Sequence, residues 1–449
     1  MPPTSIHVDR TFWRMSTLLL VITVVFLNIP AGFAWQPVGL SDGTDTNPLL
    51  RRLQWLPLWG LAAWMITQRM GVASLLLRRA NPFLVGFYLW AAMSLAWSDQ
   101  LVGSINRLIQ LYAILMIAAA FCVASWGRYR FELVTLRVLL WLLVISLIMV
   151  VVVPRYAVHN DLGLQGEWAG ITTHKNKLGL VFSVAMMLAT FAYASRFISL
   201  TRFLASAALI GVIAMGCSST TSIVLAVLTS AIVWLTIRSP LDADGKLPAL
   251  AALGIILVGT PYLIATLLSA PPTMIDILTP VTDALGKDIT FTGRSELWGL
   301  VLSEANRHPI IGRGYGSFWL GPGGPSQWIS DLLNWIPYQS HNGYIDIYNQ
   351  LGLIGLGLLL GFFVWHFRQI WQIWRHDRPT AALHLGLVIY AIISNITETS
   401  MFRPPSWIGS LLVFSSVVLS RTQLQLEFDA AMQRMQHADT AATTHRQET

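Results

Sequence analysis

The chain alternates long apolar runs with short polar segments. A helix needs about 20 apolar residues to cross the hydrocarbon core of a bilayer. Several runs are shorter than this, so the ends of the spans are predicted only to within a few residues. We place twelve spans, near residues 16–35, 53–68, 82–97, 105–126, 133–153, 177–195, 202–217, 222–237, 248–269, 343–367, 381–396 and 404–420.

These runs predict an all-α polytopic membrane protein with about twelve transmembrane helices. We expect a single transmembrane domain over residues 1–420, with a long loop over about 270–342. A loop of that length usually has a function. Its segment Ser295–Arg307 has helical spacing, which predicts a short helix inside the loop.

Residues 421–449 form a charged tail after the last span. One helical face of this tail carries Leu424, Phe428, Ala431 and Met435. This pattern favours an amphipathic helix on the membrane interface. A disordered tail is the alternative.

Composition supports the membrane assignment and narrows the partners. The 449 residues are 54% hydrophobic and 11% charged, whereas soluble domains carry about 25% charged residues. The net charge of +7 does not indicate nucleic-acid binding, because the cations lie in short clusters between apolar runs. Cys122 and Cys217 both lie inside apolar runs, so we expect free thiols.

The positions of the cations predict the orientation. Cytoplasmic loops of membrane proteins carry an excess of Lys and Arg. With the N-terminus inside, the even-numbered loops are cytoplasmic and most of the cations lie inside. These loops contain Arg69, Arg78, Arg79, Arg128, Arg130, Arg137, Arg196, Arg202, Arg238, Lys246, Arg368, Arg375 and Arg378. We therefore expect both termini in the cytoplasm and the long loop outside.

Five external cations depart from this rule. They are Lys175, Lys177, Arg294, Arg307 and Arg313. Ion pairs with external acids would explain any one of them. A shared anionic ligand explains the set better, since Arg binds a phosphate or diphosphate through a bidentate fork and Lys as a point charge.

Two histidines lie at the outer ends of spans. His174 precedes a span, and His341 stands where the long loop re-enters the membrane. An isolated interfacial histidine is more often a structural donor than a catalyst. His341 is the better candidate for a general base, because an unperturbed imidazole accepts a proton near neutral pH. No spacing of His, Cys or Glu suggests a metal site, and the glycines of Gly312–Gly316 follow no strand, so they do not indicate a nucleotide site.

A transporter is the rival class. Ion-coupled carriers usually hold ionisable side chains in mid-span. The predicted spans contain almost none, which disfavours a proton-coupled carrier. A lipid flippase that uses only cations stays open.

Three blocks of the sequence match a known family. They are Trp168–Asn176, then Thr292–Trp298 with Pro309 and Gly312–Trp319, and finally His341–Tyr344 leading into Gln350–Leu356. On these blocks the chain resembles the O-antigen ligase/polymerase (Wzy-like) superfamily of bacterial envelope glycosyltransferases, over roughly residues 16–420. The first two blocks look most like exopolysaccharide polymerases of the ExoQ type.

This resemblance implies a GT-C-like membrane glycosyltransferase that needs no metal or other cofactor and inverts the anomeric centre. Its donor would be a glycan on undecaprenyl diphosphate, attacked at the periplasmic face of the inner membrane by the hydroxyl of a glycan or lipid-linked acceptor. By resemblance, His341 becomes the general base and Arg294 holds the diphosphate. The expected binding residues are Lys175, Lys177, His174, Arg313, Asn342 and Tyr344.

Two departures bear on the specific activity. Many ligases carry an arginine after a serine near a mid-chain span, and here Cys217–Ser222 contains none. Ligases also often have Glu where this chain has Gln350. Both differences favour a polymerase of lipid-linked repeat units over an O-antigen ligase acting on lipid A–core, with a flippase as the third possibility. A chain-length regulator is a candidate partner.

Overall fold

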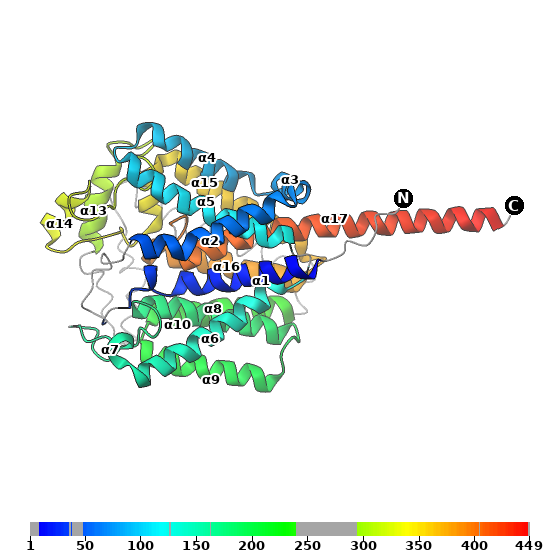
Figure 1. Cartoon of the computed structure of the whole chain (residues 1–449), viewed down its shortest axis with the longest axis horizontal. Helices are drawn as coiled ribbons and strands as arrows, with labels where there is room; N and C mark the ends of the chain where they lie inside the picture. Colours follow the sequence, from blue (N-terminus) through cyan, green and yellow to red (C-terminus); the bar gives the residue numbers. More distant parts are fainter. Residues whose placement is uncertain are drawn as a thin grey trace.

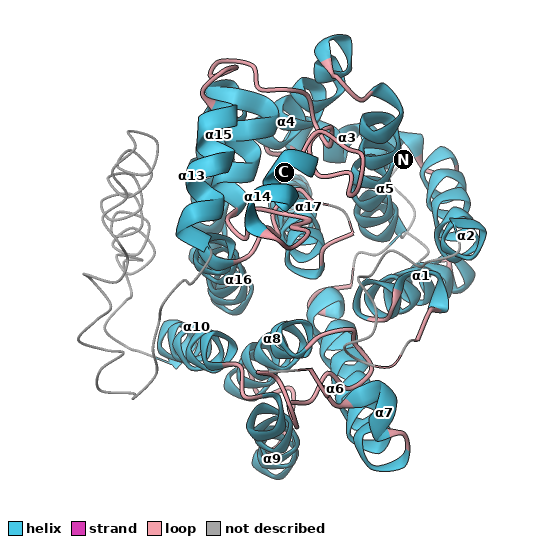
Figure 2. Ribbon diagram, turned by 90° about the vertical axis from the view of Figure 1, so that its left-hand side faces the viewer, coloured by secondary structure: helices cyan, strands magenta, loops and turns pink. Residues whose placement is uncertain are grey.

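The computed structural model describes residues 9–35, 37, 48–124, 127–161, 163–238, 294–403 and 405–447. Over these ranges the fold is helical and contains no β-strand (Figure 2). One isolated bridge pairs Val158 with Trp168. The predicted all-α fold is confirmed.

The long helices lie roughly along one direction (Figure 1). They are α1 (Arg10–Asn28), α2 (Pro48–Thr67), α4 (Pro82–Met93), α5 (Leu101–Ala124), α6 (Arg130–Val152), α8 (Lys175–Ala194), α9 (Leu200–Cys217), α10 (Thr220–Arg238), α15 (Gly343–Trp374), α16 (Arg378–Thr397) and α17 (Trp407–Gln447). The short elements are η1 (Ala31–Phe33), α3 (Met70–Arg79), η2 (Ser94–Trp97), α7 (Pro154–Ala157), α13 (Arg294–Ala305) and α14 (Gln327–Leu333).

Within the described residues, nine helices are long and apolar enough to cross a membrane. A tenth span results if α2 and α3, which meet at 96°, are counted together, and Pro82–Trp97 is a shorter apolar helix. The protein is therefore a multi-pass membrane protein. The predicted span 248–269 and the loop up to residue 293 lie outside the described residues, so the count of twelve stays a prediction.

The bundle has two chemically different ends. At one end, α3 and α17 are joined by an ion pair of Arg79 with Glu427 at 2.8 Å, and Arg128 pairs with Asp377 at 2.9 Å. At the other end lie α7, α13 and α14 (Figure 1). The basic loops that the sequence assigns to one side of the membrane therefore meet at one end, opposite the helix that begins at Arg294.

Polar contacts connect the helices inside the bundle. His384 of α16 contacts the hydroxyl of Ser415 in α17 at 2.7 Å, and the same hydroxyl contacts His366 of α15 at 3.2 Å. Glu132 of α6 lies 3.8 Å from His384. Side-chain hydrogen bonds of this kind hold membrane helices together, because lipid offers polar groups no alternative partner.

The predicted tail is helical. α17 continues without a break across residue 421, and its C-terminal part projects beyond the bundle (Figure 1). Phe428 and Met435 are exposed on it. Its position relative to a membrane surface stays a prediction.

Candidate functional site

The first sequence block forms the N-terminal cap of α8. The ring of His174 accepts a hydrogen bond from the backbone N–H of Asn176 at 3.1 Å. Lys175 pairs with Glu167 at 2.5 Å, and the ammonium of Lys177 donates to the hydroxyl of Thr173 at 2.8 Å. The charge of Lys175 is thus already balanced by a carboxylate.

The surroundings of His174 favour its neutral form. Burial lowers the pKa of His174 to about 4, and the nearby ring of His159 acts in the same direction. The two rings lie edge to face with centroids 5.0 Å apart. His174 is therefore neutral at physiological pH and acts as a hydrogen-bonding group.

The third block begins α15 and holds His341 in an unusual backbone conformation. His341 has φ +55°, a left-handed value that costs a non-glycine residue of order 1–3 kcal/mol. Asn342 caps α15, because its side-chain oxygen accepts from the N–H groups of Tyr344 and Ile345. The next residue, Gly343, lies so close to Asn395 that a Cβ would fall 2.1 Å from its side-chain oxygen.

Two predicted binding residues of this block have structural contacts. The hydroxyl of Tyr344 donates to the carbonyl of Ile392 in α16 at 2.9 Å. The side-chain nitrogen of Asn342 is buried and has no hydrogen-bond partner within the described part of the chain. Of the two, Asn342 is the one that leaves a donor for a ligand.

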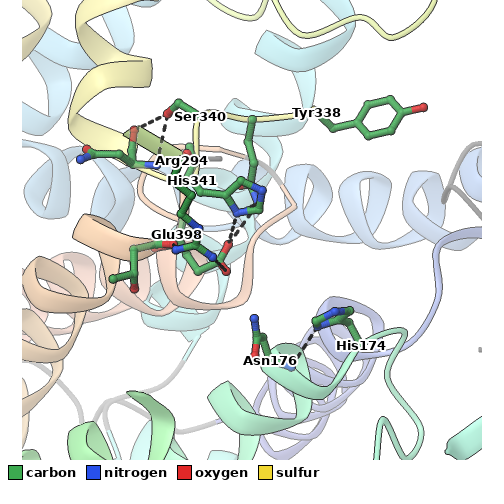
Figure 3. Close-up of polar contacts among 12 residues, drawn as sticks. His174, Asn176, Arg294, Tyr338, Ser340, His341 and Glu398 are labelled. Atoms are coloured by element: carbon green, nitrogen blue, oxygen red, sulfur yellow. Dashed lines mark hydrogen bonds and ion pairs between the residues drawn. The ribbon is translucent and has the colours of Figure 1, made fainter. Parts of the chain in front are cut away.

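His341 faces a carboxylate from a segment that is distant in the sequence. Its Nδ1 lies 3.3 Å from Oε2 of Glu398, which follows α16 (Figure 3). Arg294, the first residue of α13, donates to the carbonyl of Thr397 at 3.0 Å and lies 3.9 Å from Oε1 of Glu398. The two predicted catalytic residues therefore meet at one glutamate.

Gln339 and Arg403 complete this group. The amide nitrogen of Gln339 donates to Glu398 at 3.0 Å and lies 3.2 Å from Nδ1 of His341. Arg403 donates to the side-chain oxygen of Gln339 and, at 3.0 Å, to the carbonyl of Tyr338. We call His341, Arg294, Glu398, Gln339 and Arg403 the His341 cluster.

The cap of α8 faces the His341 cluster across a short gap. Figure 3 shows His174 and Asn176 below the pair of His341 and Glu398. The charge of Glu398 acts on both His174 and Lys177, and Lys177 also interacts with the charge of Arg403. The structure therefore brings the first block near the His341 cluster, whose residues lie more than a hundred positions later in the sequence.

Electrostatics keeps Glu398 ionised. Burial alone would raise its pKa, but the hydrogen bond from His341 and the charge of Arg294 outweigh burial and lower the pKa of Glu398 below its usual value. Burial lowers the pKa of Arg403, and the nearby carboxylates of Asp346 and Glu398 oppose that effect. The cluster thus contains a carboxylate flanked by cations.

Two of the five external cations form ion pairs away from the His341 cluster. Arg313 pairs with Asp99 at 2.7 Å and with Glu304, and Arg307 pairs with Glu304 at 3.0 Å. The ion-pair interpretation therefore accounts for both. Lys177 and Arg294 are the two whose surroundings include the His341 cluster.

The glycine-rich segment Gly312–Gly316 packs against a break in α15. The N–H groups of Arg313 and Gly314 donate to the carbonyls of Asn349 and Gln350. Gly352 interrupts the helix with φ +65°, and a Cβ there would fall 2.2 Å from the carbonyl oxygen of Ile310. This segment therefore supports α15, and the N–H groups of Arg313 and Gly314 are engaged by that helix.

The stretch that lacks the expected arginine packs on the first turn of α8. Cys217 donates to the carbonyl of Lys175 at 2.9 Å, and Ser222 lies against Gly179. Both cysteines are free, as predicted. Lys177 projects from the same turn of α8 and is the nearest cation of the first block that is not paired with a carboxylate in the described structure.

Sequence reasoning missed Glu398, Gln339 and Arg403. Glu398 and Arg403 are charged residues in the short segment between the last two predicted spans, on the side that should carry few charges. The rule that cations gather in cytoplasmic loops, which singled out the other external cations, could have singled out Arg403 as well. Among the described residues, no group of three or more His, Cys, Asp or Glu side chains is arranged to hold a metal ion.

Comparison with known proteins agrees with the motif resemblance. Residues 204–360, about a third of the chain, match the sequence model of the O-antigen ligase family. This segment includes Arg294 and His341 and stops before Glu398. The chain is also 27% identical over 139 residues to the exopolysaccharide production protein ExoQ of Rhizobium meliloti (strain 1021). That match covers 30% of this chain and 32% of the relative. Both matches support the resemblance of this chain to the O-antigen ligase/polymerase superfamily.

Proposed function

We propose that this protein joins lipid-linked oligosaccharide repeat units into a surface polysaccharide at the periplasmic face of the bacterial inner membrane. The observation that carries the proposal is the meeting of His341, Arg294 and Glu398 at the end of the bundle opposite the basic loops. The resemblance to ExoQ supports a polymerase. Both termini are then cytoplasmic.

In the proposed reaction, a hydroxyl of the acceptor sugar attacks the anomeric carbon of a glycan on undecaprenyl diphosphate. The bond between that carbon and the diphosphate oxygen breaks, so the glycosidic bond forms with inversion and the lipid diphosphate leaves. The hydroxyl proton passes to His341. General-base catalysis contributes about 10²- to 10⁴-fold.

Glu398 sets the tautomer of His341. We assign the Nδ1–H of His341 as the donor to Glu398, which leaves Nε2 with a lone pair for the acceptor hydroxyl. The carboxylate also stabilises the imidazolium once the proton has been taken. Glu398 therefore acts on the reaction through His341.

The surrounding cations suit a diphosphate. Arg294, Arg403 and Lys177 supply three positive charges against the one negative charge of Glu398, an excess of two. A departing diphosphate brings negative charge into this site, and fixed cations stabilise it without reorganisation. In this mechanism Arg294 binds the diphosphate, Lys177 takes the place of the missing arginine, and no metal is required.

A ligase is the second candidate, because the matching family model is that of O-antigen ligase. Ligase and polymerase share donor and chemistry and differ in the acceptor. The test is product analysis with purified protein and a repeat unit on undecaprenyl diphosphate, with and without lipid A–core. A ladder of longer lipid-linked glycans without lipid A–core supports the polymerase. Transfer only when lipid A–core is present identifies a ligase, and no new bond under either condition favours a flippase.

A further inference from the structure

A buried aspartate lies directly behind the His341 cluster. Asp346, in the first turn of α15, is 1% exposed. Its Oδ1 accepts a hydrogen bond from the indole N–H of Trp319 at 2.7 Å. Its Oδ2 accepts from the backbone N–H of Ser340 at 3.3 Å and from the hydroxyl of Thr399 at 2.5 Å. Both oxygens of this buried carboxylate therefore accept hydrogen bonds from the protein itself.

The bond to Ser340 acts on the residue before His341. The carbonyl of Ser340 accepts from the indole N–H of Trp298 in α13 at 2.8 Å, so both peptide groups of Ser340 are held. The hydroxyl of Ser340 also donates to the carbonyl of Asn342 at 2.6 Å. A residue in a strained backbone conformation persists only where its surroundings enforce it. These bonds enforce the left-handed conformation of His341.

The bond to Thr399 acts on the residue after Glu398. A single oxygen of Asp346 therefore contacts the neighbour of the base and the neighbour of its carboxylate partner. Ser340 and Thr399 are 59 positions apart, and no covalent link is near enough to fix their separation. The shared acceptor fixes it.

Two half-buried arginines lie near Asp346. Arg403 interacts electrostatically with Asp346. It also binds Gln339 and Tyr338, which lie on the loop that leads to His341. Arg107 of α5 also lies close enough to interact with Asp346 and Arg403. Hydrogen bonds and nearby opposite charge reduce the cost of burying a charge, and Asp346 has three hydrogen bonds and two arginines close enough to interact with it.

We propose that Asp346 is a positioning residue that fixes the distance and orientation between His341 and Glu398. This proposal rests on the proposed function of His341 as the general base. Asp346 does not contact substrate in it. A misplacement of about 1 Å at a reacting group can cost about 100-fold in rate, so a remote support of this kind has a measurable effect.

The main experiment compares Asp346→Asn with the full-length wild type in the polymerisation assay. Asn keeps the size of the side chain but presents an N–H group to donors. The matched control is Asp331→Asn, an exposed aspartate of α14 that accepts only from Gln327 among the contacts described. We expect kcat of Asp346→Asn to fall roughly 10- to 100-fold, with KM for the lipid-linked donor changed by less than about threefold. Asp331→Asn should match the wild type.

A double variant separates positioning from general damage to the fold. If Asp346 acts through the pair, Asp346→Asn should add little to the loss already caused by Glu398→Gln. An equal loss in both backgrounds would overturn the proposal. Where Asp346→Asn yields too little folded protein, Thr399→Val removes only one bond of the three and should show a smaller loss with the same non-additivity.

A readout independent of activity uses diethyl pyrocarbonate, which modifies neutral imidazoles, with peptide mass spectrometry. The side chain of His341 is 25% exposed and therefore reachable. In the wild type the ring is held against Glu398, 3.3 Å from its carboxylate. Asp346→Asn and Glu398→Gln should each release the ring from this contact, expose it further and speed modification of His341 by at least about threefold, while modification of the exposed His308 stays constant. An unchanged rate at His341 in Asp346→Asn would contradict the proposal.

The two proposals fail in different ways. Polymerisation by His341→Ala at the wild-type rate would remove the general-base role, whatever the modification rates show. Wild-type kcat in Asp346→Asn, alongside an inactive His341→Ala, would remove the positioning role and leave the proposed function intact.

Discussion

At the residue scale, the ionisation of Glu398 connects the geometry of the site to pH. Its carboxylate is 27% exposed and is contacted by Gln339, His341 and Arg294. These neighbours lower its pKa against the opposing effect of burial. Protonation of Glu398 is therefore not expected to lower activity between pH 7 and pH 5, since its pKa lies below its usual value.

Glu398 should also contribute to stability in a defined pH window. Its folded pKa lies below that of the unfolded chain, which is about 4.3. The stabilisation is thus fully present above about pH 4.3 and is lost as pH falls through the folded pKa. We expect Glu398→Gln to be less stable than wild type at pH 7 by about 1–2 kcal/mol, and the two to converge in acid. Thermal denaturation in detergent from pH 7 downward measures this, and a constant difference down to the lowest pH would contradict it.

Arg294 should not be replaceable by lysine. Its guanidinium reaches both the carbonyl of Thr397 and the carboxylate of Glu398, and a lysine is a point charge without this fork. Arg294→Lys should lower kcat/KM for the lipid-linked donor by about 10- to 100-fold, the value of a charged hydrogen bond. Arg307→Lys is the control, because Arg307 lies two residues after the end of the same helix and its side chain is 71% exposed. Equal activity of both variants would remove Arg294 from the diphosphate site.

Single residues of the site were predictable to different degrees. His341 and Arg294 follow from sequence motifs and from the excess of charge on the outer side. Glu398 and Arg403 come from another part of the chain, and only folding shows that they meet His341. The ion pair of Lys175 with Glu167 likewise depends on a loop geometry that no periodicity encodes.

At the element scale, the start of α15 is held against α16 by a glycine. A Cβ on Gly343 would fall 2.1–2.4 Å from the amide of Asn395. The side-chain oxygen of Asn395 accepts from the N–H groups of Ser400 and Met401, two and three residues after Glu398. The closeness of the two helices therefore also positions the segment that carries Glu398.

Gly343→Ala should disturb this contact. We expect a loss of about 1–3 kcal/mol of stability, the usual cost of overpacking, together with lower activity. Gly357→Ala in the same helix is the control, since nothing lies within 4 Å of its Cβ position and alanine favours a helix by about 0.5–1 kcal/mol over glycine. Thermal denaturation and polymer yield measure both, and an equally stable Gly343→Ala would refute the packing argument.

The helices were more predictable than their interruptions. Long apolar runs predicted α5, α6, α8, α9, α10 and α16 near their observed limits, and helical spacing predicted α13. The span predicted near 53–68 ends where α2 meets α3 at 96°. α3 itself was not predicted, because its arginines assigned this segment to a cytoplasmic loop. The break at Gly352 depends on the approach of Ile310, a contact between segments distant in sequence.

At the scale of the whole molecule, the two ends of the bundle have separate roles in our account. The basic end carries Arg79, Arg128 and their partners, and we propose that it faces the cytoplasm. The opposite end carries the His341 cluster, where a lipid-linked donor can present its diphosphate at the membrane boundary. The central claim is that glycosidic bonds form there and that His341 is the base.

The most direct measurement is the product ladder from a purified His341→Ala variant with the repeat unit on undecaprenyl diphosphate. His308→Ala, a change in an exposed histidine of the same loop region, is the control. The account predicts that His341→Ala folds and inserts normally but makes polymer at a rate lower by about two or more orders of magnitude, whereas His308→Ala makes the wild-type ladder. A full ladder from His341→Ala at the wild-type rate would contradict it.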